Sequence, residues 1–167
     1  MTDAETLASK PATDSASLLV KWMGIGDANS AAFIHGGVVM RLCDEAAGIA
    51  ALRHCGGRVV TGGMDRMTFT HPVHIGELVT CKAQVNAAWR TSMEVGVRVE
   101  AENPRTGEAR HTSTAYLTMV AVDEEGRPVA VPPLVVSGET EQRRQREAEL
   151  RRANRLAERE QIIGERD

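Results

Sequence analysis

The segment at residues 38–54 constrains the fold more than any other part of the chain. It is mostly apolar, contains no proline and has Gly48 as its only glycine. Its apolar residues cover most of a helical circumference, which predicts a helix buried on nearly all sides. Gly56 and Gly57 follow, where such a helix is expected to end. A helix of this kind needs other elements of the chain to enclose it.

Extended segments elsewhere in the chain can provide that enclosure. Residues 78–89 and 92–102 alternate apolar with polar side chains, a period of two that is typical of strands with one covered face. In the second segment, Glu94, Arg98 and Glu100 fall on the uncovered face. Further strands are predicted at residues 17–22, 58–69 and 110–122. Together the segments predict an α+β fold in which an antiparallel sheet wraps a central helix, and an edge-to-edge dimer would protect the sheet edges.

The length of 167 residues fits one domain. We expect a flexible N-terminus at residues 1–14, a folded domain at 15–136 and a charged tail at 137–167. From Glu139 onward the tail has eight acidic and eight basic residues, which favours an exposed helix over a nucleic-acid-binding arm. A thin apolar stripe on this helix consists of Ala148, Leu150, Ala153, Leu156 and Ala157.

Composition argues against several classes of binding partner and several kinds of site. The net charge is −3 and aromatic residues make 3 %, so neither electrostatics nor base stacking supports nucleic-acid binding. No apolar stretch approaches the roughly 18 residues that cross a bilayer, and residues 1–11 lack an apolar signal core. Cys43, Cys55 and Cys81 include no C-x-x-C pair, which argues against a disulfide framework or a zinc site. These features predict a cytoplasmic protein without membrane insertion or a metal.

Two carboxylates interrupt the apolar helix. Asp44 and Glu45 stand beside Leu42, Cys43 and Ala46, and a carboxylate among such residues needs either a partner or a function. One interpretation is a structural pair with a neighbouring arginine, either Arg41 or Arg53. The other is a general base or nucleophile.

Gly36 and Gly37 open the same helix. Free backbone N–H groups there, at the positive end of the helix dipole, can polarise a carbonyl oxygen, and glycine lets a substrate approach closely. Asp44 lies eight residues beyond Gly36, about 12 Å along a helix. One chain therefore cannot bring both to one carbonyl group. Two antiparallel helices across a two-fold axis can, which predicts sites shared between subunits.

Two polar residues precede the helix. The amide of Asn29 can hold a water or a carbonyl oxygen, or it can simply form an Asx turn. His35 can act as an acid or base, although its place at the helix start is equally consistent with a turn or packing role. The chain contains no G-x-G-x-x-G, Walker, H-E-x-x-H or G-x-S-x-G motif.

Four segments of the chain resemble acyl-CoA thioesterases of the hotdog fold. They are HGGVVMRLCDEAA at residues 35–47 with Asn29 before it, VTGGMDRMTF at 60–69, PVHIGE at 72–77 and RTSMEV at 90–95. The similarity runs from about residue 16 to residue 160 and is greatest to the cytosolic acyl-CoA hydrolase branch, which includes brown-fat-inducible thioesterases.

The resemblance implies a hotdog fold that pairs into a double hotdog, commonly assembled as a trimer of dimers. The family's catalytic aspartate and asparagine fall on Asp44 and Asn29, and its oxyanion donor falls on Gly36 or Gly37. Coenzyme A enters only as part of the substrate or product. The residues expected near it are Arg90, Thr91, Ser92 and Thr61. The chain departs from many family members at one position, where Ala32 replaces glycine.

The activity that this resemblance implies is hydrolysis of an acyl-CoA thioester to a free acid and coenzyme A. Two alternatives remain open at this point. One is a hydratase or dehydratase on the same fold, for which His35 is the candidate acid or base. The other is a non-catalytic acyl-CoA sensor that uses its charged tail as a docking arm.

Overall fold

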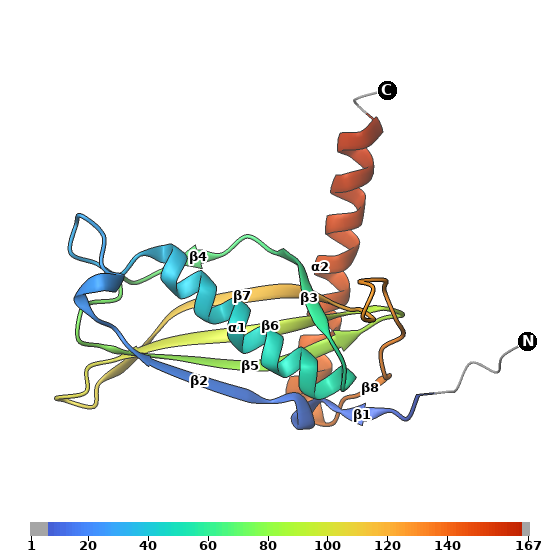
Figure 1. Cartoon of the computed structure of the whole chain (residues 1–167), viewed down its shortest axis with the longest axis horizontal. Coiled ribbons are helices and arrows are strands. Elements are labelled where there is room, and N and C mark those ends of the chain that lie inside the picture. Colours follow the sequence, from blue (N-terminus) through green and yellow to red (C-terminus); the bar gives the residue numbers. More distant parts are fainter. Residues whose placement is uncertain (1–6, 165–167) are drawn as a thin grey trace, which may run out of the picture.

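The computed structural model describes residues 7–164 as a central helix enclosed by a curled sheet, with a second helix outside the sheet (Figure 1). The central helix, α1 (Gly36–Cys55), has 20 residues and begins two residues before the predicted segment. It ends at Gly56, which has a φ of 73°. That left-handed conformation is one that glycine adopts without strain.

Six strands form the sheet that wraps α1. Their order is β2–β5–β6–β7–β3, β4 pairs with β7, and every pairing is antiparallel. The strands are β2 (Ser17–Trp22), β3 (Val59–Met64), β4 (Thr68–Phe69), β5 (Leu78–Ala88), β6 (Ser92–Glu102) and β7 (Ala109–Ala121). The single strand predicted at 58–69 is thus two strands, because the chain leaves the sheet at residues 65–67.

The core lies between α1 and the concave face of the sheet. Val95, Val97 and Val99 of β6 are fully buried there, as the alternation predicts. The facing side chains of α1 are small and also fully buried: Ala46, Ala47, Ala50 and Ala51. Small side chains let the helix axis lie close to the sheet, so a strongly curved sheet can close around it. The predicted α+β fold with a central wrapped helix is confirmed.

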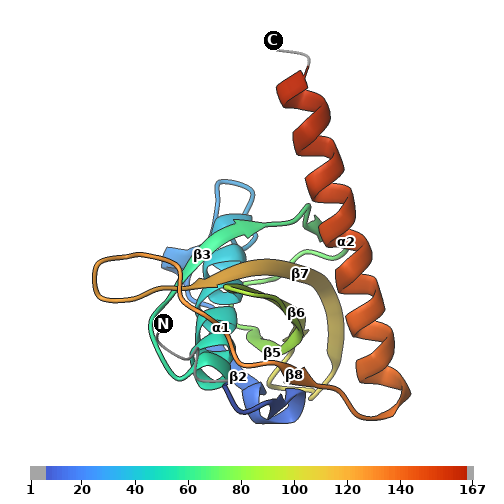
Figure 2. The ribbon, with the colours of Figure 1, turned by 90° about the vertical axis from the view of Figure 1, so that its right-hand side faces the viewer.

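The second helix, α2 (Gly138–Gly164), runs across the outer face of the sheet and extends beyond it (Figure 2). Its packing corrects the predicted apolar stripe. Only Ala148 of that stripe is buried, whereas Leu150 and Leu156 are 63 % and 45 % exposed. The helix instead turns arginines toward the sheet, where they pair with carboxylates. None of the helices among the described residues is long and apolar enough to span a membrane.

Glu94 marks where the outer face departs from the sequence prediction. The alternation places it on the uncovered face, but α2 covers it completely. Arg151 donates two hydrogen bonds to its carboxylate, at 3.1 and 2.7 Å. Asn86 of β5 donates a third, at 3.2 Å. The prediction failed because the partner arginine lies 57 residues away along the chain.

The N-terminal part is more structured than predicted. Lys10 and Pro11 form β1, which pairs in parallel with β8 (Leu134–Val135). A short 3₁₀ helix, η1 (Ala12–Ser15), follows, and both of its end residues are buried. The flexible segment predicted at 1–14 is therefore wrong for residues 10–14, and its residues 1–6 lie outside the described part of the chain.

Candidate active site

Asp44 lies midway along α1 and points toward the edge strand β3. The hydroxyl of Thr61 donates a hydrogen bond to Asp44 Oδ1 at 2.5 Å. Asp44 is half-buried rather than enclosed in the apolar core, which corrects the sequence prediction. The hydrogen bond orients one carboxylate oxygen, and the second oxygen is the one that can accept a proton from water. Thr61, expected near coenzyme A, is thus also the residue that holds Asp44.

The adjacent carboxylate, Glu45, forms the structural ion pair with an arginine that the sequence allowed. Glu45 is exposed and accepts a hydrogen bond from Arg41 at 2.9 Å, one helical turn earlier. Successive helix residues point about 100° apart, so Glu45 cannot share the position of Asp44 beside Thr61. The structure therefore separates the two interpretations left open by the sequence: among residues 7–164, Glu45 pairs with an arginine and Asp44 does not.

The start of α1 presents backbone donors next to an apolar cavity. His35 is the N-cap residue, and its side chain forms no capping hydrogen bond. The first N–H groups of a helix have no partner within the helix, so those at Gly36 and Gly37 are suited to a carbonyl oxygen. A Cβ on Gly37 would meet no atom of the described part of the chain within 4 Å, so the approach to this glycine is open there. A Cβ on Gly36 would lie 3.3 Å from the ring of Phe69.

The cavity beside this helix start has a volume of about 330 Å³. Its lining is mainly apolar and includes Phe33, Ile34, Val39, Phe69 and Val73. An apolar cavity next to free N–H groups can hold a carbonyl compound with a hydrocarbon substituent.

Asn29 forms the Asx turn that the sequence allowed. Its Oδ1 accepts hydrogen bonds from the N–H groups of Ala31 and Phe33, at 2.9 and 3.2 Å. The side-chain NH₂ is the part of Asn29 that can serve a ligand. Ala32 lies in the same turn with a φ of 62°, a left-handed conformation that a glycine adopts more easily.

A charged pair fixes Asp27, whose backbone in turn binds His35, the residue before α1. Lys21 donates to Asp27 Oδ1 at 2.6 Å, and this hydrogen bond, with another from the Gly24 N–H, lowers the pKa of Asp27 below its usual value. The backbone carbonyl of Asp27 accepts the N–H of His35 at 2.9 Å. The loop that carries Asn29 is therefore tied to β2 and to the start of α1.

The turn between β5 and β6 holds Arg90 and Thr91, and Ser92 is the first residue of β6. Arg90 is exposed, and the backbone oxygen of Thr91 accepts the N–H of Ala121 at 3.1 Å. Ser92 is in register with Val120, which is in register with Val60. Three adjacent strands span about 10 Å, so the turn lies at the end of the sheet near Thr61.

The predicted site residues form two separate groups within one chain. Asp44 and Thr61 meet at the middle of α1, whereas Asn29, Gly36 and Gly37 lie at its start. Among the described residues, no hydrogen bond joins Asp44 to any of these three. Eight helical residues separate the groups by about 12 Å, as the sequence predicts. One chain therefore holds the two groups apart and does not bring both to one carbonyl group.

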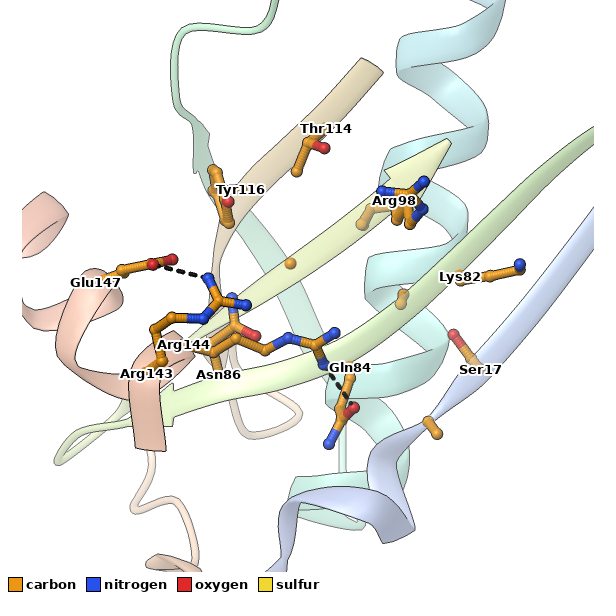
Figure 3. Close-up of a pocket in the computed structure, with 14 residues that line it drawn as sticks. Ser17, Lys82, Gln84, Asn86, Arg98, Thr114, Tyr116, Arg143, Arg144 and Glu147 are labelled. Atoms are coloured by element: carbon orange, nitrogen blue, oxygen red, sulfur yellow. Dashed lines mark hydrogen bonds and ion pairs between the residues drawn. The ribbon is translucent and has the colours of Figure 1, made fainter. Parts of the chain in front are cut away.

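A second cavity, of about 370 Å³, lies on the outer face of the sheet between the strands and α2 (Figure 3). Lys82, Arg98, Arg143 and Arg144 line it, but each is engaged already. The first two pair with Glu100, Arg143 pairs with Glu147, and Arg144 donates to Gln84. Because this cavity and α1 lie on opposite faces of the sheet, it is not part of the Asp44 site.

Comparisons with known proteins agree with this fold. A model of the thioesterase superfamily matches residues 31–108, the span from the loop that carries Asn29 through β6 to the turn before β7. A hexameric acyl-CoA thioesterase of known structure is 36 % identical and superposes with a TM-score of 0.87, over 91 % of this chain and 97 % of that one. The chain belongs to the thioesterase superfamily. It is a hotdog-fold member, related to the acyl-CoA thioester hydrolases.

Two curated relatives are similar to much of this chain. The rat cytosolic acyl coenzyme A thioester hydrolase is 34 % identical over 87 % of this chain, and protein VdlD of Helicobacter pylori is 40 % identical over 66 % of it. The chain spans 39 % of the rat hydrolase and 63 % of VdlD.

Proposed function

We propose that the chain is an acyl-CoA thioester hydrolase, which converts an acyl-CoA to a free carboxylic acid and coenzyme A. The observation that carries the proposal is the oriented carboxylate of Asp44, held by Thr61 on an open sheet edge. The names of the related proteins, acyl-CoA thioesterase and acyl coenzyme A thioester hydrolase, support the same chemistry. The cytosolic relative also supports a cytoplasmic location.

The proposed active unit is a double hotdog. Strand β3 lies at the end of the strand order, and Val60, Thr61 and Gly62 on it are exposed. An exposed strand edge is a ready surface for pairing with another strand. Antiparallel pairing of two β3 strands around a two-fold axis brings Asp44 of one chain toward Gly36 of the other. Three such dimers give the hexamer, which is the state named for the related structure.

In the proposed mechanism, the N–H groups at Gly36 and Gly37 bind the thioester oxygen and stabilise the negative charge that develops on it. Asp44 of the partner helix takes a proton from water, which attacks the carbonyl carbon. The C–S bond then breaks, and the thiolate of coenzyme A leaves and takes up a proton. Direct attack by Asp44 would instead form an anhydride that water hydrolyses to the same products.

The remaining site residues have positioning roles in this proposal. The NH₂ group of Asn29 orients the water or the substrate. Arg90, with Thr91 and Ser92, holds the phosphates of coenzyme A from the β5–β6 turn. The apolar cavity at the start of α1 takes the part of the acyl chain next to the thioester. No step in this scheme uses a metal ion or a further cofactor.

The test is thiol release from a panel of acyl-CoAs of increasing chain length, with hydration of an enoyl-CoA measured in parallel. We expect thiol release by the wild type and its loss in Asp44→Ala, with the fold retained by circular dichroism. Hydration of the enoyl-CoA without thiol release would instead support the hydratase alternative and His35. Binding of acyl-CoA with neither reaction would support the sensor alternative.

A further inference from the structure

A network of charges joins α2 to the segment between the two halves of the site. Its centre is the fully buried Glu94, which Arg151 and Asn86 hydrogen-bond. Arg155 lies one turn further along α2. Its Nη1 is 3.6 Å from Glu94 Oε2 and 2.7 Å from Asp65 Oδ2. Asp65 is the first residue after β3. The network therefore extends from Glu94 near the start of β6, through α2, to the end of the edge strand β3.

The position of Asp65 in the chain gives this contact its importance. Thr61, which holds Asp44, lies four residues before Asp65, and Phe69, which packs over Gly36, lies four residues after it. The segment 61–69 thus runs past both halves of the proposed site and touches each at one end. Asp65 is its midpoint, where the chain has left β3 and has not yet entered β4.

Two hydrogen bonds fix Asp65. Its N–H donates to the backbone oxygen of Tyr116 at 2.9 Å, and its carboxylate accepts from Arg155. The guanidinium of Arg151 lies 3.6 Å from the centroid of the Tyr116 ring, so α2 contacts the residues on both sides of this backbone hydrogen bond. The side chains of Asp65 and Arg155 are 19 % and 30 % exposed, so solvent screens the pair only partly.

We propose that Arg155 is a positioning residue for the hydrolase site, acting through Asp65 on the segment 61–69. The helix α2 holds the midpoint of this segment, and the segment sets the places of Thr61 beside Asp44 and of Phe69 over Gly36. This proposal rests on the proposed function for its kinetic consequences. Its structural consequence, the ordering of residues 61–69, does not depend on any activity.

The kinetic test compares Arg155→Ala, Asp65→Asn and the double variant. Small misplacements of reacting groups are costly to rate, so we expect each single variant to lower kcat about tenfold and to change KM by less than about twofold. The double variant should be no slower than either single one, because both remove the same contact. Arg155→Lys keeps a positive charge near Asp65 and should recover most of the lost kcat.

Arg143→Ala is the matched control, because Arg143 pairs within α2 with Glu147 and does not contact the segment 61–69. It should leave kcat unchanged. Asp65→Asn serves as the second variant if Arg155→Ala does not fold, since it leaves the α2 contacts with Glu94 intact. Full kcat in Arg155→Ala, effects that multiply in the double variant, or an equal loss in Arg143→Ala would each overturn the proposal.

Hydrogen–deuterium exchange separates this proposal from the proposed function. Peptides covering residues 61–69 should exchange faster in Arg155→Ala and Asp65→Asn than in the wild type or in Arg143→Ala. If the wild type releases no thiol from any acyl-CoA, the proposed function fails, while faster exchange still supports the positioning contact. Unchanged exchange in both variants refutes the contact whether or not the chain is a hydrolase.

Discussion

The two faces of the sheet hold their helices in opposite ways. On the concave face, α1 packs through fully buried alanines against fully buried valines of β6. On the outer face, α2 buries only Ala148 completely and is held by arginines that pair with Glu94 and Asp65. One contact is apolar and non-directional, whereas the other is polar and depends on the geometry of a few groups.

Because of this difference, we expect the packing of α1 to tolerate single substitutions better than the packing of α2 does. Apolar packing along the whole of α1 fixes the helix that carries Asp44, and its strength is spread over many side chains. The attachment of α2 depends on a limited set of polar contacts, namely the ion pairs around the buried Glu94 and hydrogen bonds with Gln84 and Trp89, so a single substitution at Glu94 can disturb it. The following predictions test this comparison, from the largest expected effect to the smallest.

Replacement of Asp44 should have the largest effect on activity. Asp44→Asn keeps the size of the side chain but removes its basicity, so we expect kcat to fall by about 10³-fold or more. Glu45→Gln is the matched control on the same helix, and it should keep kcat within about twofold because Glu45 only pairs with Arg41. Steady-state thiol release measures both. Equal losses in the two variants would show that α1 is merely sensitive to charge.

Removal of the buried carboxylate on the outer face should have the largest effect on stability. Burial opposes the charge of Arg151, but the hydrogen bonds and charge of Glu94 outweigh it and raise the pKa of Arg151. Glu94→Ala leaves this cation unpaired, so the free energy of unfolding should fall by about 3–5 kcal/mol. Chemical denaturation gives the value.

Glu100→Ala is the control for Glu94→Ala. Glu100 lies on the same face of the same strand and pairs with Lys82 and Arg98, whose side chains are 52 % and 54 % exposed. Its removal should cost at most about 1 kcal/mol. A cost for Glu94→Ala that does not exceed the cost for Glu100→Ala would mean that α2 is held by something other than this network.

Two leucines test the apolar side of the comparison. Leu117 of β7 is fully buried in the core, whereas Leu150 of α2 is 63 % exposed. We expect Leu117→Ala to lower the free energy of unfolding by about 3 kcal/mol. Leu150→Ala should change it by less than about 0.5 kcal/mol in the isolated protein. A comparable loss at Leu150 would indicate that its side of α2 is covered in solution.

The smallest effect concerns His54, which lies near the end of α1. Burial lowers the pKa of His54, although its hydrogen bond with the Pro132 carbonyl opposes the shift. The unfolded chain therefore binds more protons, so stability falls as the pH drops below the unfolded pKa of about 6.5. Denaturation midpoints at pH 7 and pH 5.5 should show this fall in the wild type. His54→Gln should show less of it, and an unchanged slope would exclude His54 as its source.

Local pattern in the sequence was sufficient to predict the concave face. The alternation of Val95, Val97 and Val99 and the all-round apolar character of α1 report burial directly, because side chains alternate along a strand and rotate regularly along a helix. The positions of Asp44 and the helix-start glycines followed from the same helical geometry.

The outer face could not be predicted in this way. The residues near Glu94 in the sequence do not indicate that Arg151 covers it, because the two partners lie on elements far apart in the chain. The alternating charges of α2 suggested a solvated helix, yet Arg151 pairs with the buried Glu94 of the sheet and Leu150 faces outward. The bond between Thr61 and Asp44 was missed for the same reason, because it joins β3 to α1 across a turn.

The central claim is that each active site is built from two chains, and complementation tests it most directly. Asp44→Ala and Asn29→Ala chains, carrying different affinity tags, are co-expressed, and the assemblies that contain both are purified. If Asp44 of one chain works with Asn29 of the other, each mixed dimer keeps one of its two sites intact. Random pairing makes about half of the dimers in a hexamer mixed, so thiol release should reach about one quarter of the wild-type value. Mixed assemblies no more active than either single variant alone would contradict the shared site.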